Sequence, residues 1–233
     1  MLIICFVIQW PCLSQNSIKL DLQRIYQEYL TLDTSKDIAH LVSLDRELRS
    51  LINKPWEEKR EMVNPKYFKK EYELIGLSIG HYSDAIEYSG KLLYDAHKID
   101  PNSPYRRYTL FSMVNYIGDP NLFPNIDSAK AYASKYPNGP FIFETYCTLA
   151  QFYDDLFKVL RNLIQDSTRD NEYEAYLNFI SSQPLKEQLR TAQANGLMYY
   201  KKALRLHPND HDLKEDMKNM ENGSTESWYF NND

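Results

Sequence analysis

The chain has 233 residues, of which 43% are hydrophobic and 14% aromatic, enough to fill a sizeable core in one or two domains. Its net charge of -5 supplies no broad basic field to attract a phosphate backbone, which argues against nucleic-acid binding. Seven glycines are few for this length, and β-branched residues form no alternating runs, so the composition favours helices.

The chain begins with an uncharged apolar stretch, MLIICFVIQWPCLS, at residues 1–14. This stretch is too short to span a bilayer as a helix. Cys12 and Ser14 satisfy the small-x-small rule for cleavage before Gln15, although the basic first region of a secretory leader is missing. We expect a signal peptide at 1–14 and a periplasmic or secreted mature protein. The alternative is a buried N-terminal strand or helix.

Removal of this leader would leave Cys147 as the single cysteine of the mature chain. One cysteine cannot form an internal disulfide, so packing alone would have to stabilise the fold. Cys147 is most simply a small buried residue. A catalytic thiol would need a histidine partner, and none of the five histidines lies near Cys147 in the sequence.

Apolar residues follow three- and four-residue steps along most of the chain, which is typical of helices. The segments LDLQRIYQEYL and IAHLVSLDRELRSLI in the region 15–64 indicate a degenerate N-terminal helix pair. Further helices are expected from this spacing to the end of the chain. The full set lies near 18–31, 35–53, 66–79, 83–99, 104–117, 124–135, 140–153, 155–166, 172–181, 184–206 and 210–221.

Asn/Pro turns recur at a nearly constant interval. Pro65, Pro101 and Pro137 are 36 residues apart, and Pro208 follows after 71 residues, close to twice that interval. A proline inside a helix lowers the stability of the helix by about 3 kcal/mol, whereas a proline at the first helical position costs almost nothing. We therefore expect these turns to mark helix starts, and each 36-residue interval to hold two antiparallel helices.

Small residues recur on the same interval, at Gly76, Ser112 and Thr148. The stretch YELIGLSI at 72–79 resembles the first helix of a tetratricopeptide repeat, whose pattern is W-x2-L-G-x2-Y. GHYSDAIEY at 80–88 is similar to the turn into the second helix of that family, with Ala85 as its small packing residue. YYKKALRLHPND, later in the chain, resembles another second helix that ends in its proline.

This resemblance implies an all-α fold, a right-handed stack of antiparallel helix pairs (a TPR-like α-solenoid). The alternative is a helical bundle without repeats. In the repeat interpretation the TPR-like units occupy 65–209, a capping helix occupies 210–221, and a polar tail occupies 222–233. We expect the tail's aromatic residues, Trp228, Tyr229 and Phe230, to pack onto the last helices.

The resemblance also implies a concave face that binds extended peptides or another protein. Lys70 and Arg106, 36 residues apart, each place a cation in the first turn of an expected helix, where the helix dipole disfavours it. One hypothesis is that the two together bind a carboxylate, either an acidic side chain or a free C-terminus. The alternative is that each pairs with a surface acid, as exposed lysines and arginines commonly do. The complete predicted groove set is Lys70, Glu73, Arg106, Thr109, Met113 and Tyr116.

Motifs that would indicate an enzyme are missing from the sequence. It has no Gly-rich phosphate loop, no histidine pair at metal-binding spacing and no G-x-S-x-G elbow. HPNDHD at 207–212 could hold a metal, but a helix end, a turn and a capping aspartate explain it. Asp154 and Asp155 are interpreted as a turn between two helices, since adjacent residues on a helix point apart.

The sequence therefore predicts a non-catalytic protein- or peptide-binding scaffold of the cell envelope or exterior, without cofactor, metal or membrane span. The alternative is a structural subunit of an envelope assembly that binds through its convex face or its ends. An enzyme is the least favoured of the three classes.

Overall fold

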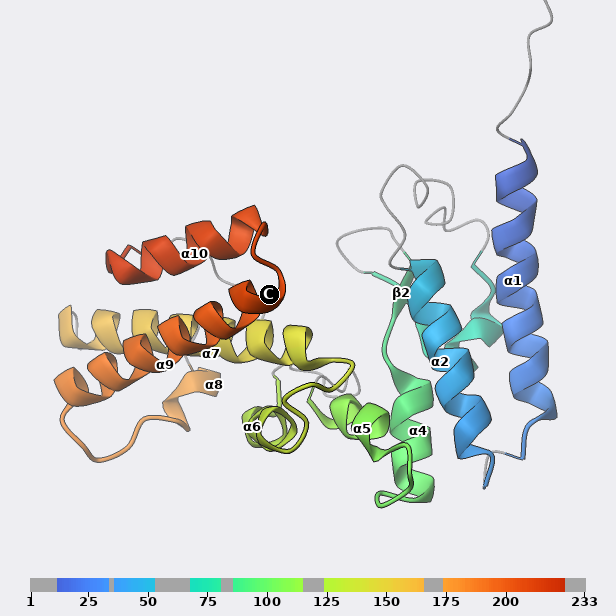
Figure 1. Cartoon of the computed structure of the whole chain (residues 1–233), viewed down its shortest axis with the longest axis horizontal. Coiled ribbons are helices and arrows are strands. Elements are labelled where there is room, and N and C mark those ends of the chain that lie inside the picture. The colour runs from blue at the N-terminus through green and yellow to red at the C-terminus, as the bar shows by residue number, and fades with distance from the viewer. Residues whose placement is uncertain are drawn as a thin grey trace, which may run out of the picture. The chain divides into compact units, whose positions relative to one another are not determined.

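The computed structural model describes residues 12–33, 36–52, 68–80, 86–114, 124–165 and 174–224. The chain divides into two compact units, Met1–Tyr105 and Arg106–Asp233, which are described separately. The described residues are mostly helical (Figure 1), which confirms the expected all-α class apart from one short β-hairpin. Most of the predicted leader and the aromatic residues of the predicted tail lie outside the described residues, as does Pro65.

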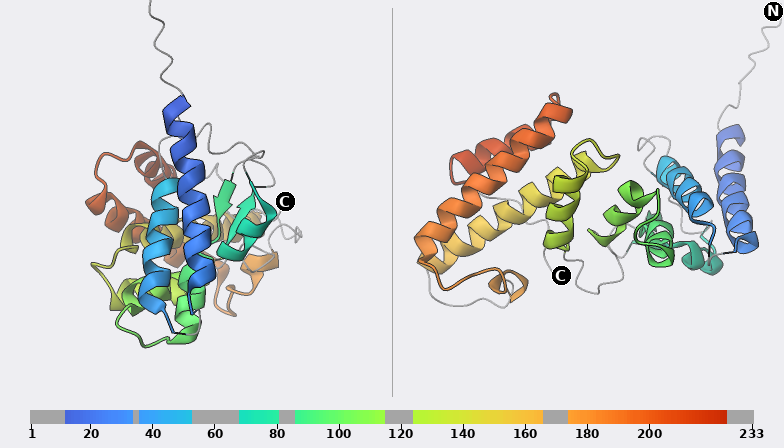
Figure 2. Two further views of the ribbon diagram at one scale, coloured as in Figure 1. Left: turned by 90° about the vertical axis from the view of Figure 1, so that its right-hand side faces the viewer. Right: turned by 60° about the horizontal axis from the view of Figure 1, so that its bottom comes forward.

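The first unit contains the helices α1 (Cys12–Thr31), α2 (Ile38–Ile52) and α4 (Lys91–Ile99). In α2, Leu41, Leu44 and Leu48 are fully buried, and their three- and four-residue spacing places them on one face of the helix. This face forms the centre of the unit, because α1 and α4 both pack against α2. Figure 2 shows α1 and α2 side by side.

A hairpin replaces the helix that the sequence predicts over 66–79. The chain forms a 3-10 helix, η2 (Lys70–Ile75), and then strand β1 (Leu77–Ile79), which pairs antiparallel with β2 (Ile86–Tyr88). The predicted helix is wrong because Gly76 adopts a left-handed conformation, with φ 84°, and ends the helical turn. The helix expected over 83–99 is correspondingly reduced to α4.

Three of the four Asn/Pro turns lie among the described residues, and all three are turns between helices. Pro101 follows α4, Pro137 lies between α6 (Ile126–Lys135) and α7 (Ile142–Gln165), and Pro208 precedes α10 (His211–Glu221). The expectation of turns is thus confirmed. The prolines do not occupy the first helical position, however, because each helix starts several residues later.

The second unit is built around two long antiparallel helices, α7 and α9 (Leu185–Leu206), which Figure 1 shows side by side. They pack together over much of their length, with α6 against α7 and α10 against α9. The shorter elements are α5 (Arg106–Thr109), η3 (Leu110–Met113) and α8 (Glu174–Leu177).

The length of α7 corrects a second prediction. The helices expected over 140–153 and 155–166 are one continuous helix, and Asp154 and Asp155 lie within it. The apolar stripe of Leu149, Phe152 and Leu156 continues past both aspartates, so the core-facing side of α7 is never interrupted. The interval between Pro137 and residue 165 therefore holds one helix rather than a pair, and the stacked-pair arrangement is not confirmed.

Candidate functional site

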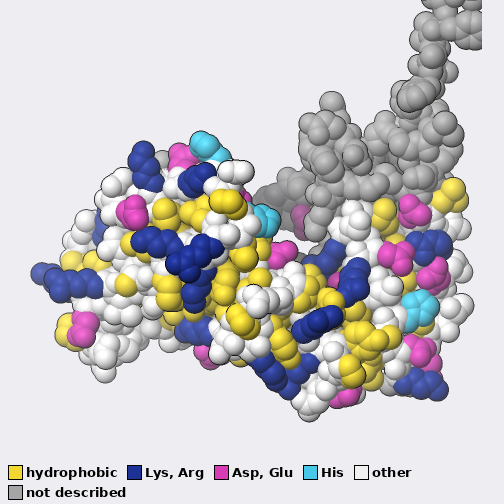
Figure 3. Space-filling view, in the orientation of Figure 1, with side chains coloured by type: hydrophobic (Ala, Val, Ile, Leu, Met, Phe, Trp, Pro, Cys, Tyr) yellow, Lys and Arg dark blue, Asp and Glu magenta, His cyan; other side chains and the backbone are white. Residues whose placement is uncertain are grey.

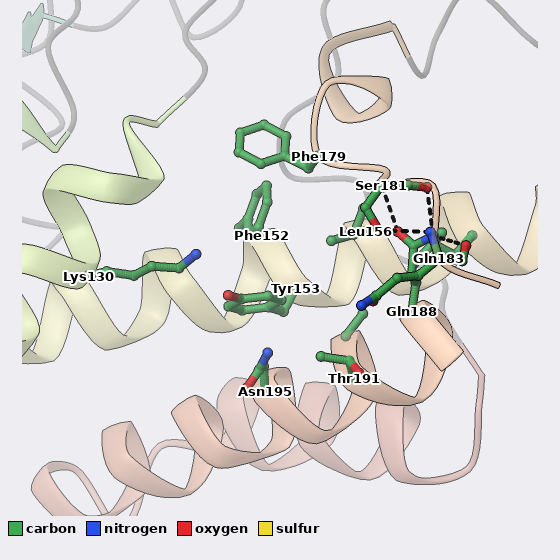
Figure 4. A pocket seen from close by; sticks show the side chains of 12 residues that line it. Lys130, Phe152, Tyr153, Leu156, Phe179, Ser181, Gln183, Gln188, Thr191 and Asn195 are labelled. Carbon is green, nitrogen blue, oxygen red and sulfur yellow. Dashed lines mark hydrogen bonds between the residues drawn. The ribbon is translucent and has the colours of Figure 1, made fainter. Parts of the chain in front are cut away.

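A pocket of about 230 Å³ opens beside α7 and α9 in the second unit. Figure 4 shows its walls, which come from α6, α7, α9 and the segment that follows α8. Its apolar side chains are those of Phe152, Leu156, Leu160, Phe179 and Ala192. Its polar side chains include those of Lys130, Ser181, Gln183, Gln188, Thr191 and Asn195. An apolar floor with a rim of amides and hydroxyls is typical of binding pockets.

The size of the pocket limits what it can hold. Pockets for cofactors and drug-sized ligands usually enclose about 300–1,000 Å³, which is more than the 230 Å³ found here. The volume is suited to one side chain of a larger partner rather than to a whole cofactor.

Aromatic rings form one wall of the pocket. The rings of Phe152 and Phe179 meet edge to face, with 4.8 Å between their centroids, and Phe152 also stacks on Tyr176 at 6.0 Å. The Phe179 side chain remains 40% exposed. An exposed phenylalanine beside an apolar hollow offers a surface that a partner could cover.

The side chain of Gln188 fixes another part of the rim. Its Oε1 accepts a hydrogen bond from the Ser181 backbone N–H at 2.9 Å, and its Nε2 donates to the Ser181 and Gln183 carbonyls at 3.0 and 2.6 Å. These bonds, drawn in Figure 4, tether the segment after α8 to the first turn of α9. The rim is therefore held in place before any ligand binds.

At the opposite end of the pocket, α6 contributes Lys130. This helix is fixed by Tyr132, whose hydroxyl donates to the Arg107 carbonyl at 2.8 Å and accepts from the Phe141 backbone N–H at 3.3 Å. The Lys130 ammonium lies over the ring of Tyr153, 5.6 Å from its centroid. The pocket thus combines an apolar floor with a cation at one end.

Three charged residues of α7 are buried next to this pocket. Asp154, Asp155 and Lys158 are only 3%, 1% and 2% exposed. The Tyr200 hydroxyl of α9 donates to Asp154 Oδ2 at 3.1 Å, and the Tyr176 hydroxyl of α8 donates to Asp155 Oδ2 at 2.7 Å. Lys158 Nζ lies 3.8 Å from Asp155 Oδ1. These contacts anchor α8 and α9 onto α7; α9 and the segment after α8 carry pocket walls.

Burial determines the ionisation of the two carboxyl groups. It raises the pKa of Asp154 and that of Asp155 to about 6, and the opposing effects of Lys158 and of the tyrosine hydroxyls are smaller. Neither aspartate lines the pocket. Both carboxyl groups are enclosed where α8 and α9 meet α7, and each accepts a hydrogen bond from one of these two helices.

Sequence reasoning missed this cluster because it placed the two aspartates in a turn. On a helix they do point in different directions, but Asp154 faces α9 and Asp155 faces α8, so both become buried. One signal was present in the sequence. Lys158 follows Asp155 by three residues within an apolar stretch, which is the spacing of an ion pair on a helix.

The predicted groove residues are divided between the two units. Lys70 and Glu73 lie exposed on η2 of the first unit, whereas Arg106, Thr109 and Met113 lie on α5 and η3 of the second. Arg106 and Met113 are half-buried, and Thr109 is fully buried. Tyr116 lies outside the described residues. The peptide-binding role of this set stays a prediction.

The HPNDHD segment and Cys147 were the other candidate sites in the sequence, and their side chains have the following contacts. Asp210 caps α10, since its Oδ1 accepts a hydrogen bond from the Leu213 backbone N–H at 3.1 Å, which confirms its interpretation as a capping residue. His207 stacks on Phe143, with 3.8 Å between ring centroids. Among the described residues, no three metal-ligating side chains gather into a cluster.

Burial raises the pKa of the half-buried Cys147 to about 12, so its thiol stays protonated at neutral pH.

A second hollow, of about 400 Å³, lies on α9 and is lined by Leu197, Met198, Lys201, Lys202 and Arg205 together with Ala194. Figure 3 shows Lys and Arg side chains among hydrophobic ones over this part of the second unit. Every described residue that lines this hollow comes from one helix. It is an open helix face, whereas the pocket beside α7 has several walls.

Comparison with known proteins adds no assignment, because no family model, curated protein or solved structure matches this chain. Within the part of the chain that the structure describes, no helix combines the length and the apolar character needed to cross a membrane.

Proposed function

We propose that this chain is a non-catalytic protein-binding module, and that the pocket beside α7 and α9 receives an apolar side chain from a peptide segment of the partner. The single observation that carries the proposal is the combination of an apolar floor, a tethered amide rim and the 40% exposed ring of Phe179. Interfaces commonly place one large apolar residue in a preformed pocket of this kind.

The free energy gained by burying one apolar side chain sets the affinity that we expect from this pocket. Full burial of a large apolar side chain contributes about 1.5–3 kcal/mol. A single anchor of this size yields only weak binding once the cost of association is counted. Contacts outside the pocket must therefore add to the affinity, and the helical surface around it supplies room for them.

The polar groups of the pocket support binding rather than catalysis. They are amides, hydroxyls and one ammonium group, whereas general acid–base catalysis needs an accessible group that titrates near the working pH. The carboxyls with suitably raised pKa values, those of Asp154 and Asp155, are almost completely buried.

Two further parts of the proposal rest on the sequence. In this proposal the leader at 1–14 exports the protein to the periplasm or the exterior. The helical scaffold, in this proposal, belongs to the tetratricopeptide-like class of binding proteins, and this assignment is carried by the sequence resemblance alone.

Fluorescence polarisation with short labelled Gly/Ser peptides tests the proposal. Each peptide carries one variable residue, chosen from Phe, Trp, Leu, Ala and Ser. We expect the peptides with Phe, Trp or Leu to bind roughly tenfold more tightly than the Ala peptide, which corresponds to about 1.4 kcal/mol. Equal binding of all the peptides would contradict the proposal.

Two variants locate the site. Thr191→Trp places a large ring at the pocket rim, and Ala194→Trp makes a matched insertion on the same helix at an exposed position outside this pocket. Thr191→Trp should abolish the preference for large apolar residues, and Ala194→Trp should leave it unchanged. The same loss in both variants, or in neither, would place the binding elsewhere.

A further inference from the structure

We infer that the bound peptide segment carries an internal Asp or Glu close to its apolar anchor residue, and that Lys130 and Asn195 read that carboxylate and the adjoining main chain. This inference rests on the proposed function, because it specifies the partner that the same pocket accepts.

Lys130 is an exposed cation of α6. Among the described residues no carboxylate forms an ion pair with Lys130, whereas the exposed Lys36 lies 2.8 Å from Asp33. Instead its ammonium lies over the ring of Tyr153. Figure 4 shows the Lys130 side chain extended towards Tyr153. Because a cation on an aromatic face keeps donors for other partners, Lys130 can pair with an incoming acid.

Asn195 supplies a second polar group at the same end. It is half-buried on α9, and Figure 4 shows its amide directed towards Tyr153. No hydrogen bond joins the Asn195 side chain to another described residue, in contrast to Gln188, whose amide is used to hold the rim. An asparagine amide has both a donor and an acceptor, which match the C=O and N–H of a peptide group.

The charge should come from a side chain and not from a C-terminus. Capture of a terminal carboxylate typically uses several backbone N–H groups arranged in a nest. Lys130 and Tyr153 lie inside α6 and α7, away from the helix starts at Ile126 and Ile142, so the backbone N–H groups around them are used within the helices. One ammonium group suits an Asp or Glu side chain.

The experiment uses the full chain and labelled peptides with one fixed Phe in a Gly/Ser background. Asp is placed in turn at each of the three positions on either side of Phe, and an otherwise identical series carries Asn. We expect one or two positions at which the Asp peptide binds about two- to fivefold more tightly than the Asn peptide, the range for an exposed ion pair. Added salt should reduce that preference.

Variants assign the preference to named residues. Lys130→Met should abolish it, whereas Lys135→Met should retain it, because Lys135 is an exposed lysine of the same helix that lies over Tyr136 rather than over Tyr153. Asn195→Ala should weaken the Asp and Asn peptides equally, by about two- to tenfold, since it removes a main-chain hydrogen bond.

The outcomes separate this inference from the proposed function. If Phe peptides bind and Thr191→Trp prevents it, but Asp and Asn peptides bind equally, the proposed function stands and the inference is wrong. Tighter binding of a peptide that ends in Phe with a free carboxylate than of its amide would also overturn the inference. Absence of binding by every Phe peptide would refute both.

Discussion

Both units of the molecule bury aspartates, and they satisfy them differently. In the first unit Asp45 is fully buried on α2. Arg49 Nε donates to its Oδ2 at 2.9 Å, and the Tyr88 hydroxyl donates to its Oδ1 at 2.8 Å. In the second unit, Asp154 and Asp155 each accept one hydrogen bond, from Tyr200 and Tyr176 respectively. Their Oδ1 atoms have no hydrogen-bond partner among the described residues.

A closer cation offsets more of the cost of burying a carboxylate. Asp45 has a cation within hydrogen-bond distance, and its partner Tyr88 also accepts from the Leu92 backbone N–H at 3.3 Å. The group therefore ties α2, β2 and α4 together. In the second unit Lys158 is 3.8 Å from Asp155, beyond normal hydrogen-bond length, so less of the desolvation cost is offset. Burial raises the pKa of Asp45 as it does that of Asp154, but Arg49 and Tyr88 oppose the rise at Asp45. We therefore expect loss of the Arg49 partner to destabilise the first unit, and loss of the Asp154 carboxylate to stabilise the second.

The largest effect should follow from breaking the pair in the first unit. Arg49→Met leaves Asp45 buried without its cation, which typically costs about 3 kcal/mol. Arg46→Met on the same helix is the comparison, because Arg46 is exposed and has a smaller effect on Asp45 than Arg49 has, and it should cost under about 1 kcal/mol. Urea unfolding followed by circular dichroism measures both variants. Equal midpoints would show that Arg49 does not stabilise the buried carboxylate.

Glycines provide the next contrast between the units. At Gly76 an added Cβ would lie 2.5 Å from Lys91 Cβ, and φ is 84°, so Gly76→Ala should cost about 2–3 kcal/mol. At Gly196 an added Cβ would lie 2.4 Å from Met220 Cε, the flexible end of a side chain. Gly196→Ala also gains helix propensity and should change stability by under about 1 kcal/mol. Similar urea midpoints for the two variants would show that the left-handed backbone of Gly76 and its close contact with Lys91 do not restrict the residue at this position.

The last prediction concerns a substitution, Asp154→Asn, that should stabilise the protein rather than destabilise it, and by an amount that depends on pH. Folding raises the pKa of Asp154 from 3.8 to about 6, so the folded state binds the proton more tightly. The Asp154 carboxyl therefore stabilises the folded state most below pH 3.8, and this contribution to the free energy of unfolding is lost as pH rises through 6. The residues that face Asp154 are Lys158, Tyr200 and Asp216, and Asp216 raises the pKa further. Asp154→Asn should therefore stabilise the second unit by about 1–2 kcal/mol at pH 7.5.

Hydrogen exchange of α7 in the full chain measures this effect. The gain from Asp154→Asn should be present at pH 7.5 and largely absent at pH 4, after correction for intrinsic exchange rates. Tyr200→Phe is a useful companion variant, because it removes the hydroxyl that binds Asp154 and should destabilise α7 at pH 7.5. A constant difference between wild type and Asp154→Asn at both pH values would show that the Asp154 carboxyl does not titrate with a raised pKa.

The sequence anticipated features that depend on neighbouring residues. Apolar spacing located α2, α6, α9 and α10, and the capping role of Asp210 follows from a hydrogen bond to a backbone group three residues away. The same local reasoning failed at 66–79, because the secondary structure of that segment depends on β1 pairing with β2 and on the close contact between Lys91 and Gly76.

The candidate pocket was not predictable from the sequence, since its walls come from α6, α7, α9 and the segment after α8. Its surroundings depend on partners far along the chain: Tyr200 reaches Asp154 across 46 residues, and Tyr176 reaches Asp155 across 21. By itself the sequence determined the helical class, the turns at Pro101, Pro137 and Pro208, and the cap of α10, because turn and capping energies act within a few residues. Only the tertiary structure decided the hairpin, the uninterrupted α7, the buried aspartates and the pocket, because strand pairing and burial depend on which distant segments come together.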